Sequence, residues 1–236
     1  GISCSELSAD WAAQRIKGLS LKTAVLTALG KKDKGIKTLI ESFKYPEKGP
    51  GMMWETVASE VTSRGSKVCL NSDVTRINRT GTKIESVEML SEPSAHIARF
   101  DGSHFISSMP LPDLVLRLDP PAPESVRQAA QKLRYRDFLT VCLIIDVAEL
   151  FDDNWIYIHD ANVKVGRIQN YKNWSPEMVP EKGKSSLGLE YFCNEGDAIW
   201  SMEDDELVEL AKQEMKELGL LQVDDVIDGC VFRVEK

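Results

Sequence analysis

The chain has 236 residues, of which 42% are hydrophobic and 28% are charged, and it carries a net charge of −8. This composition is that of an ordinary globular protein and excludes global disorder. The acidic balance argues against a nucleic-acid partner, and no stretch reaches the roughly 18 apolar residues that would predict a transmembrane segment.

The first part of the chain is predicted to be helical. Apolar residues recur every three or four positions through residues 6–29, which is typical of amphipathic helices. Proline and glycine interrupt the chain between residues 46 and 51. A further amphipathic helix is expected after this break, with Met53, Val57 and Val61 on one stripe.

From residue 68 the apolar residues alternate with a period of two, which indicates strands. We expect a strand at 68–77, its partner at 83–90, and a hairpin over 97–109 with its turn at Asp101-Gly102. Helices are expected over about 124–133 and after Ser201, where acidic residues form a capping-box pattern. Further strands are expected at 138–147, 155–159, 163–170, 187–193 and 228–234. The predicted fold class is therefore mixed α+β, with a mainly antiparallel sheet in the second half.

The sequence contains no self-contained catalytic motif, so we assign no catalytic residue. The five cysteines have no CxxC spacing, and no histidine has a metal-ligand partner three or four residues away, so no metal site is predicted. The only G-x-G is Gly49-Pro50-Gly51, where proline removes an amide that a phosphate-binding loop uses. Single thiols in apolar runs favour a reducing, cytoplasmic location.

One segment, residues 154–176, is unusually rich in aromatic and amide side chains around a single arginine, Arg167. Aromatic rings stack on planar ligands, tyrosine hydroxyls form hydrogen bonds, and a guanidinium binds phosphate or carboxylate through parallel hydrogen bonds. The segment therefore suits recognition of a polar ring that bears an anionic group. A half-buried sheet with an aromatic outer face explains the same residues equally well.

Three segments together resemble the flavin-dependent amine oxidase superfamily, which includes protoporphyrinogen oxidase and the UDP-galactopyranose mutases. Residues 50–77 are similar to the family's turn, helix and strand that return to the FAD-binding domain, and residues 101–110 to its strand that ends in Met-Pro. Residues 155–176 look most like the eukaryotic-type UDP-galactopyranose mutases. The resemblance implies FAD as cofactor and a small-molecule substrate, with a nucleotide sugar as one possibility.

The resemblance also implies roles for individual residues. Val74 corresponds to the residue whose backbone amide and carbonyl contact the flavin adenine, although its sequence context alone indicates a core valine. Arg15 and Arg167 correspond to two arginines that hold the substrate diphosphate. Tyr157 corresponds to a tyrosine that hydrogen-bonds the same diphosphate, and Trp155 to an aromatic residue near the uridine.

The resemblance divides the chain into a helical part of the substrate domain at residues 1–48, a partial FAD-binding domain at 49–116, and the rest of the substrate domain at 117–236. The G-x-G-x-x-G motif that grips the FAD pyrophosphate is absent, and the chain begins with Gly1 rather than Met. We therefore expect the chain to be a fragment of a longer FAD-dependent oxidoreductase or mutase. Alone, the fragment is expected to be inactive and to bind FAD weakly or not at all. The alternatives are an amine, porphyrin or isoprenoid oxidase or desaturase, and a non-enzymatic binding module.

Overall fold

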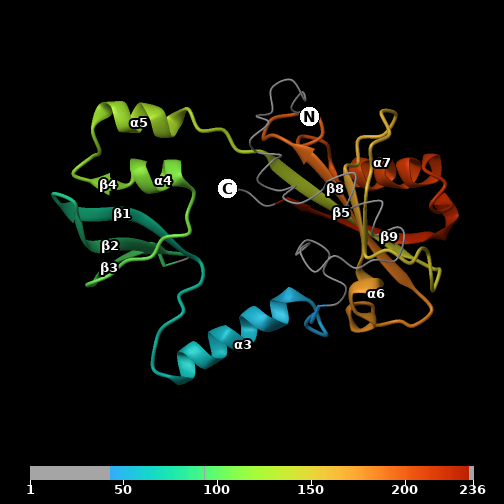
Figure 1. The fold of residues 1–236 in the computed structure, drawn as a ribbon, viewed down its shortest axis with the longest axis horizontal. Coiled ribbons are helices and arrows are strands. Elements are labelled where there is room, and N and C mark those ends of the chain that lie inside the picture. Colours follow the sequence, from blue (N-terminus) through green and yellow to red (C-terminus); the bar gives the residue numbers. More distant parts are fainter. Residues whose placement is uncertain (1–42, 93, 234–236) are drawn as a thin grey trace, which may run out of the picture. The chain divides into compact units, whose positions relative to one another are not determined.

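The computed structural model describes residues 43–92 and 94–233 (Figure 1). The chain divides into two compact units, Gly1–Pro46 and Glu47–Lys236. The second unit contains helices and two largely antiparallel sheets, which confirms the predicted α+β class. Arg15 and the helices predicted within residues 6–29 lie outside the described residues. No helix in the described part of the chain is both long and apolar enough to cross a membrane.

The first sheet has the strand order β3-β2-β1-β4. Strands β1 (Ser72–Thr80), β2 (Lys83–Ser91) and β3 (His96–Asp101) form an antiparallel meander, and the short β4 (Leu118–Asp119) pairs parallel to β1. Helix α3 (Pro50–Ser63) precedes this sheet, and helices α4 (Leu111–Leu116) and α5 (Glu124–Gln131) flank β4 and pack on each other. Strand β4 thus belongs to the first sheet. The division expected from the sequence put residues from 117 onward, and so β4, in the substrate domain.

The hairpin predicted over residues 97–109 is wrong. Strand β3 ends at Asp101, where it pairs with Ser86 of β2, and the chain then runs without a strand to α4. Ile106, within the second half of the predicted hairpin, is fully exposed. The residues after Gly102 form no strand, so they do not add to the free edge of β3, the outer strand of its sheet.

The second sheet is antiparallel throughout, with the order β6-β7-β8-β5-β9. Its strands agree with the predicted ones within a few residues at each end. They are β5 (Asp137–Ile145), β6 (Trp155–Tyr157), β7 (Arg167–Asn170), β8 (Ser185–Cys193) and β9 (Val226–Arg233). The one-turn helix α6 (Tyr171–Trp174) and two short 3₁₀ turns, η2 (Pro176–Met178) and η3 (Val223–Asp225), lie in the connections.

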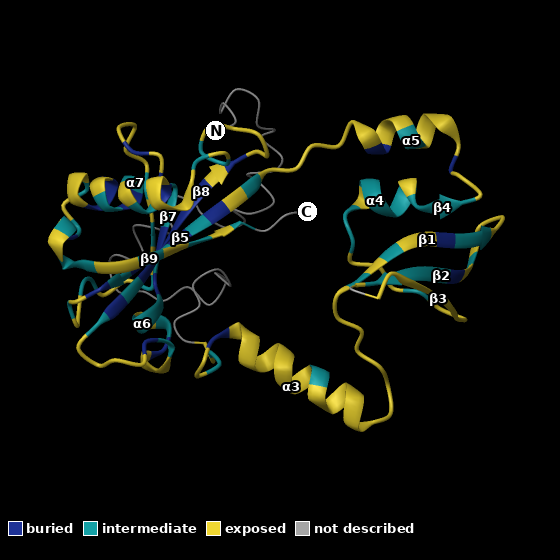
Figure 2. Cartoon of the chain, turned by 180° about the vertical axis from the view of Figure 1, so that it is seen from behind, coloured by how far each residue is buried: buried dark blue, intermediate teal, exposed yellow. Residues whose placement is uncertain are grey.

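Helix α7 (Asp204–Glu217) covers one face of this sheet (Figure 2). Buried apolar residues of the helix share a core with alternate residues of β5 and β8. These residues are Leu207, Ala211 and Met215 of the helix and Leu139, Val141, Leu187 and Leu189 of the strands. A capping box at Glu203 and Glu206 starts the helix, and Gly219, at a φ of 70°, lies just beyond its end.

The side chain of Glu214 ties α7 to the connection that precedes β7. Glu214 is buried, and its two carboxylate oxygens accept hydrogen bonds from the backbone N–H groups of Lys164 at 2.7 Å and Val165 at 3.1 Å. Burial, and next the negative charge of Glu214, raise the pKa of Tyr191 well above its usual range. The tyrosine therefore stays neutral beside the carboxylate.

Replacing Glu214 by alanine leaves two backbone donors without their acceptors. We expect Glu214→Ala to lower the free energy of unfolding by about 1–3 kcal/mol, the cost of unsatisfied buried polar groups. Urea unfolding followed by circular dichroism measures this. Glu217→Ala, at an exposed position of the same helix, is the control and should change stability by less than about 0.5 kcal/mol. Equal effects of the two substitutions would contradict the assigned role.

Candidate functional site

The face of the second sheet opposite α7 carries two rows of side chains that cross all five strands. The strand registers place one residue of each strand in each row, and opposed residues share a face of an antiparallel sheet. The Glu190 row consists of Tyr157, Arg167, Glu190, Thr140 and Phe232. The Cys142 row consists of Trp155, Gln169, Gly188, Cys142 and Cys230.

Glu190 is the most buried charged residue of this face, with 2% of its surface exposed. Its Oε2 accepts a hydrogen bond from Arg167 Nε at 2.7 Å and also contacts Arg167 Nη2. Its Oε1 accepts a hydrogen bond from Gln169 Nε2. Both carboxylate oxygens are therefore used, and the buried charge is balanced by the guanidinium.

The guanidinium of Arg167 lies between Glu190 and the ring of Tyr157. Its Cζ is 5.9 Å from the Tyr157 ring centroid, within the range of a cation–π contact. Burial acts to lower the pKa of Arg167, but hydrogen bonds and charge attraction from Glu190 and Tyr157 raise it overall. Arg167 is therefore a fixed positive charge in a defined orientation.

Further aromatic side chains lie in the neighbouring Cys142 row and in α6. Trp155 stacks on Trp174 of α6, with ring centroids 5.0 Å apart and planes inclined by 10°. Trp155 and Tyr157 remain 42% and 58% exposed, so both can contact a ligand. Gly188 leaves room for Tyr171, because a Cβ at that position would collide with the Tyr171 hydroxyl.

The end of the same face near Cys193 is apolar. Phe138 of β5 lies directly opposite Phe192 of β8, with ring centroids 6.4 Å apart. Both rings are about two-fifths exposed, at 42% and 40%. The face therefore combines a charged, aromatic part with an apolar part.

The structure brings Trp155, Tyr157 and Arg167 together, as the sequence grouped them, while their roles stay predictions. The sequence did not single out Glu190 and Gln169. A charged residue in the middle of the apolar run 187–193 was the signal that could have identified Glu190.

Val74 lies on β1 in the first sheet and is half-buried. Its carbonyl accepts a hydrogen bond from Arg117 Nη1. Arg117 Nη1 also forms an ion pair with Asp73 Oδ1 at 2.7 Å. Helix α3 begins at Pro50, which has no N–H to offer a phosphate. The start of α3 therefore lacks one of the backbone amides that a phosphate-binding turn uses. No group of three or more potential metal ligands occurs among the described residues.

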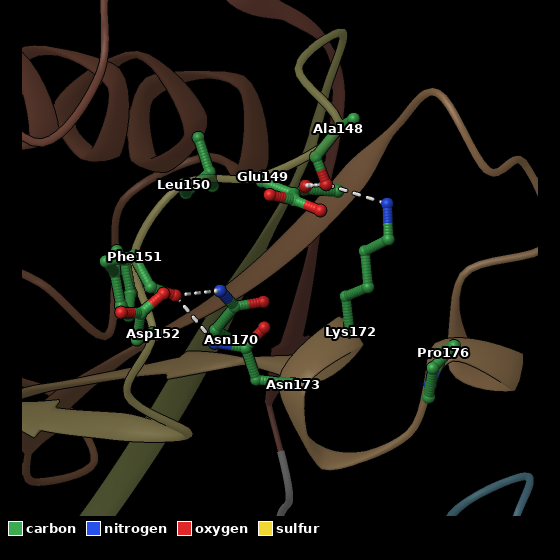
Figure 3. Close-up of a pocket in the computed structure, with 10 residues that line it drawn as sticks. Ala148, Glu149, Leu150, Phe151, Asp152, Asn170, Lys172, Asn173 and Pro176 are labelled. Carbon is green, nitrogen blue, oxygen red and sulfur yellow. Dashed lines mark hydrogen bonds between the residues drawn. The ribbon is translucent and has the colours of Figure 1, made fainter.

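A cavity of about 600 Å³ lies beside α6 and is lined in part by residues 148–152 (Figure 3). Lys172 donates hydrogen bonds to three backbone carbonyls at 2.7 to 2.9 Å. Asn170 and Asn173 both donate to the Phe151 carbonyl, at 3.2 and 2.6 Å. These bonds hold the loop in place, so we assign these polar groups a structural role.

Removing the Glu190 carboxylate isolates the charge of Arg167. We expect Glu190→Ala to lower the free energy of unfolding by about 1–3 kcal/mol, because Arg167 and Gln169 lose their acceptor while Arg167, at 31% exposure, can still be hydrated. The double variant Glu190→Leu with Arg167→Met should recover most of this loss. Urea unfolding tests both, with the exposed Glu195→Ala as control. A loss below about 1 kcal/mol in Glu190→Ala would contradict the role assigned to the pair.

Several solved structures have a similar fold. Reduced UDP-galactopyranose mutase is similar with a TM-score of 0.64 and 16% identity, over 81% of this chain and 40% of that chain. A candidate protoporphyrinogen oxidase from Exiguobacterium sp. 255-15 has a TM-score of 0.58 and 16% identity, over 79% and 39% of the two chains. A double mutant of putrescine oxidase has a TM-score of 0.54 and 16% identity, over 78% and 38%.

The chain thus spans about two-fifths of the length of these structures. No curated protein matches it significantly in sequence. The sequence model of the family described as flavin containing amine oxidoreductase matches residues 2–235. Because this match covers nearly the whole chain, the chain belongs to the flavin containing amine oxidoreductase family.

Proposed function

We propose that this chain is the substrate-binding part of a FAD-dependent enzyme that acts on a nucleotide sugar, and that it has no activity alone. The observation that carries the proposal is the Glu190 row, where Arg167 is held beside the exposed ring of Tyr157. The fold similarity to UDP-galactopyranose mutase supports it. The four described cysteines are free thiols, which supports a cytoplasmic location.

The arrangement suits a nucleoside diphosphate. A guanidinium has five N–H donors in a rigid fork, and Glu190 occupies those on one side of Arg167. The remaining donors can bind a phosphate oxygen, and Trp155 and Tyr157 can contact a planar base or a sugar ring. Since Glu190 cancels the charge of Arg167, a diphosphate needs a second cation, a role we assign to Arg15.

In this proposal, most contacts to the flavin come from residues of the enzyme outside the described ones. When bound, it supplies the redox or covalent chemistry, while the protein binds and orients the substrate. Val74 remains the residue proposed to contact its adenine. The Val74 carbonyl accepts a hydrogen bond from Arg117. To bind the adenine as well, this carbonyl would have to accept a second hydrogen bond or lose the one from Arg117.

The apolar part of the same face favours a second candidate. Phe138 and Phe192 form an exposed aromatic pair beside the Glu190 row, which suits an amine, porphyrin or isoprenoid substrate. Such a ligand would place its apolar body on these rings and would not depend on Arg167 for a diphosphate contact.

The nucleotide-sugar proposal predicts that uridine diphosphate binds the 236-residue chain and that Arg167→Ala weakens this binding about tenfold to hundredfold. This factor corresponds to the loss of charge-assisted hydrogen bonds of about 1.5–3 kcal/mol. Arg15→Ala should have a similar effect. Isothermal titration calorimetry measures the dissociation constants.

Arg99→Ala is the matched control, since Arg99 is an exposed arginine paired with Asp101 on the first sheet. The Arg99→Ala variant should bind uridine diphosphate with the same dissociation constant as the unchanged chain. Unchanged affinity in both Arg15→Ala and Arg167→Ala would refute the diphosphate assignment. Absence of uridine diphosphate binding, with an apolar amine bound instead and weakened by Phe192→Ala, would favour the second candidate.

A further inference from the structure

Two cysteines lie directly opposite each other on the sheet face opposite α7. Cys142 of β5 pairs with Cys230 of β9 in the strand register. Opposed residues of antiparallel strands have Cα atoms about 4.5–5.5 Å apart, within the range of about 4.4–6.8 Å found for disulfides. Cys230 is also among the groups that raise the pKa of the Cys142 thiol. Little backbone movement therefore separates them from a disulfide.

The two sulfurs differ in access. Cys230 is exposed and lies on β9, the edge strand of the sheet, whereas Cys142 is partly buried. Cys142 Sγ is 3.3 Å from Ser186 Oγ. Burial raises the pKa of the Cys142 thiol, against the opposing effect of Ser186. Cys230 is therefore the sulfur that an external reagent meets first.

The other described cysteines lack such a partner. Cys69 is exposed outside the strands, and Cys193 is buried opposite Asp137. Neither is opposed to a cysteine in any strand pair of the described residues. Among the described cysteines, Cys142 and Cys230 are thus the two that lie directly opposite each other on neighbouring strands.

We propose that Cys142 and Cys230 form a redox-active dithiol that reacts with low-molecular-weight disulfides. The Cys230 thiolate attacks one sulfur of the small disulfide, which forms a mixed disulfide and releases one small thiolate. Cys142 then loses its proton to solvent and attacks the Cys230 sulfur, which closes the protein disulfide and releases the second small thiolate. The protein loses two electrons, and the small disulfide gains them.

Closure would join the edge strand β9 to β5 within the Cys142 row, which also contains Trp155 and Gln169. The proposal depends on the cysteine geometry alone and is independent of the nucleotide-sugar assignment.

The test treats the reduced 236-residue chain carrying Cys4→Ser with oxidised glutathione, followed by peptide mass spectrometry. We expect a peptide pair joined through Cys142 and Cys230, lighter by two hydrogen atoms, with no glutathione left on either residue. In Cys142→Ser, glutathione should remain on Cys230. In Cys230→Ser, Cys142 should react at least tenfold more slowly than Cys230 does in the parent.

Cys69 is the internal control, because an exposed single thiol should keep its glutathione. Retention of glutathione on Cys230 in the parent chain, as on Cys69, would overturn the proposal. So would a Cys142 that reacts as fast as Cys230.

Discussion

The buried carboxylate of Glu190 fixes how β7 joins the second sheet. A carboxylate with 2% exposure is tolerated only if it is paired, and its partners Arg167 and Gln169 both come from β7. A slip of β7 by one residue would turn both partners to the α7 face. The ion pair therefore specifies the register of β7 against β8 and, through β7, the position of Tyr157 and Trp155 on β6.

A second buried carboxylate performs a comparable task on the other face. Glu214 of α7 binds two backbone N–H groups just before β7, so the connection into β7 is fixed from the helix side while the strand itself is fixed by Glu190. Between the two lies an apolar core that includes Leu189 and Ile168. The aromatic face is thus built on a rigid support, which lets it remain exposed without losing its geometry.

Much of this fold could be predicted from local pattern. The runs that became β5 and β8 are long and apolar, and the helix α7 has its capping box and its glycine end in the sequence itself. The predicted hairpin failed because apolar residues after Gly102 do not by themselves show that the segment pairs with β3, which is present and has a free edge. Arg167 stood out by composition, but its partner Glu190 is 23 positions away. Likewise, the pairing of Cys142 with Cys230 depends on a strand register that no short segment encodes.

We propose that the Glu190 row, with Trp155 beside it, is the ligand-binding face of this chain. Titration of the isotope-labelled chain with uridine diphosphate, followed by NMR, tests it most directly. We expect saturable shifts that concentrate at Trp155, Tyr157, Arg167, Gln169 and Glu190. Saturable shifts confined to the cavity beside α6 or to the first sheet, with none on this face, would contradict it.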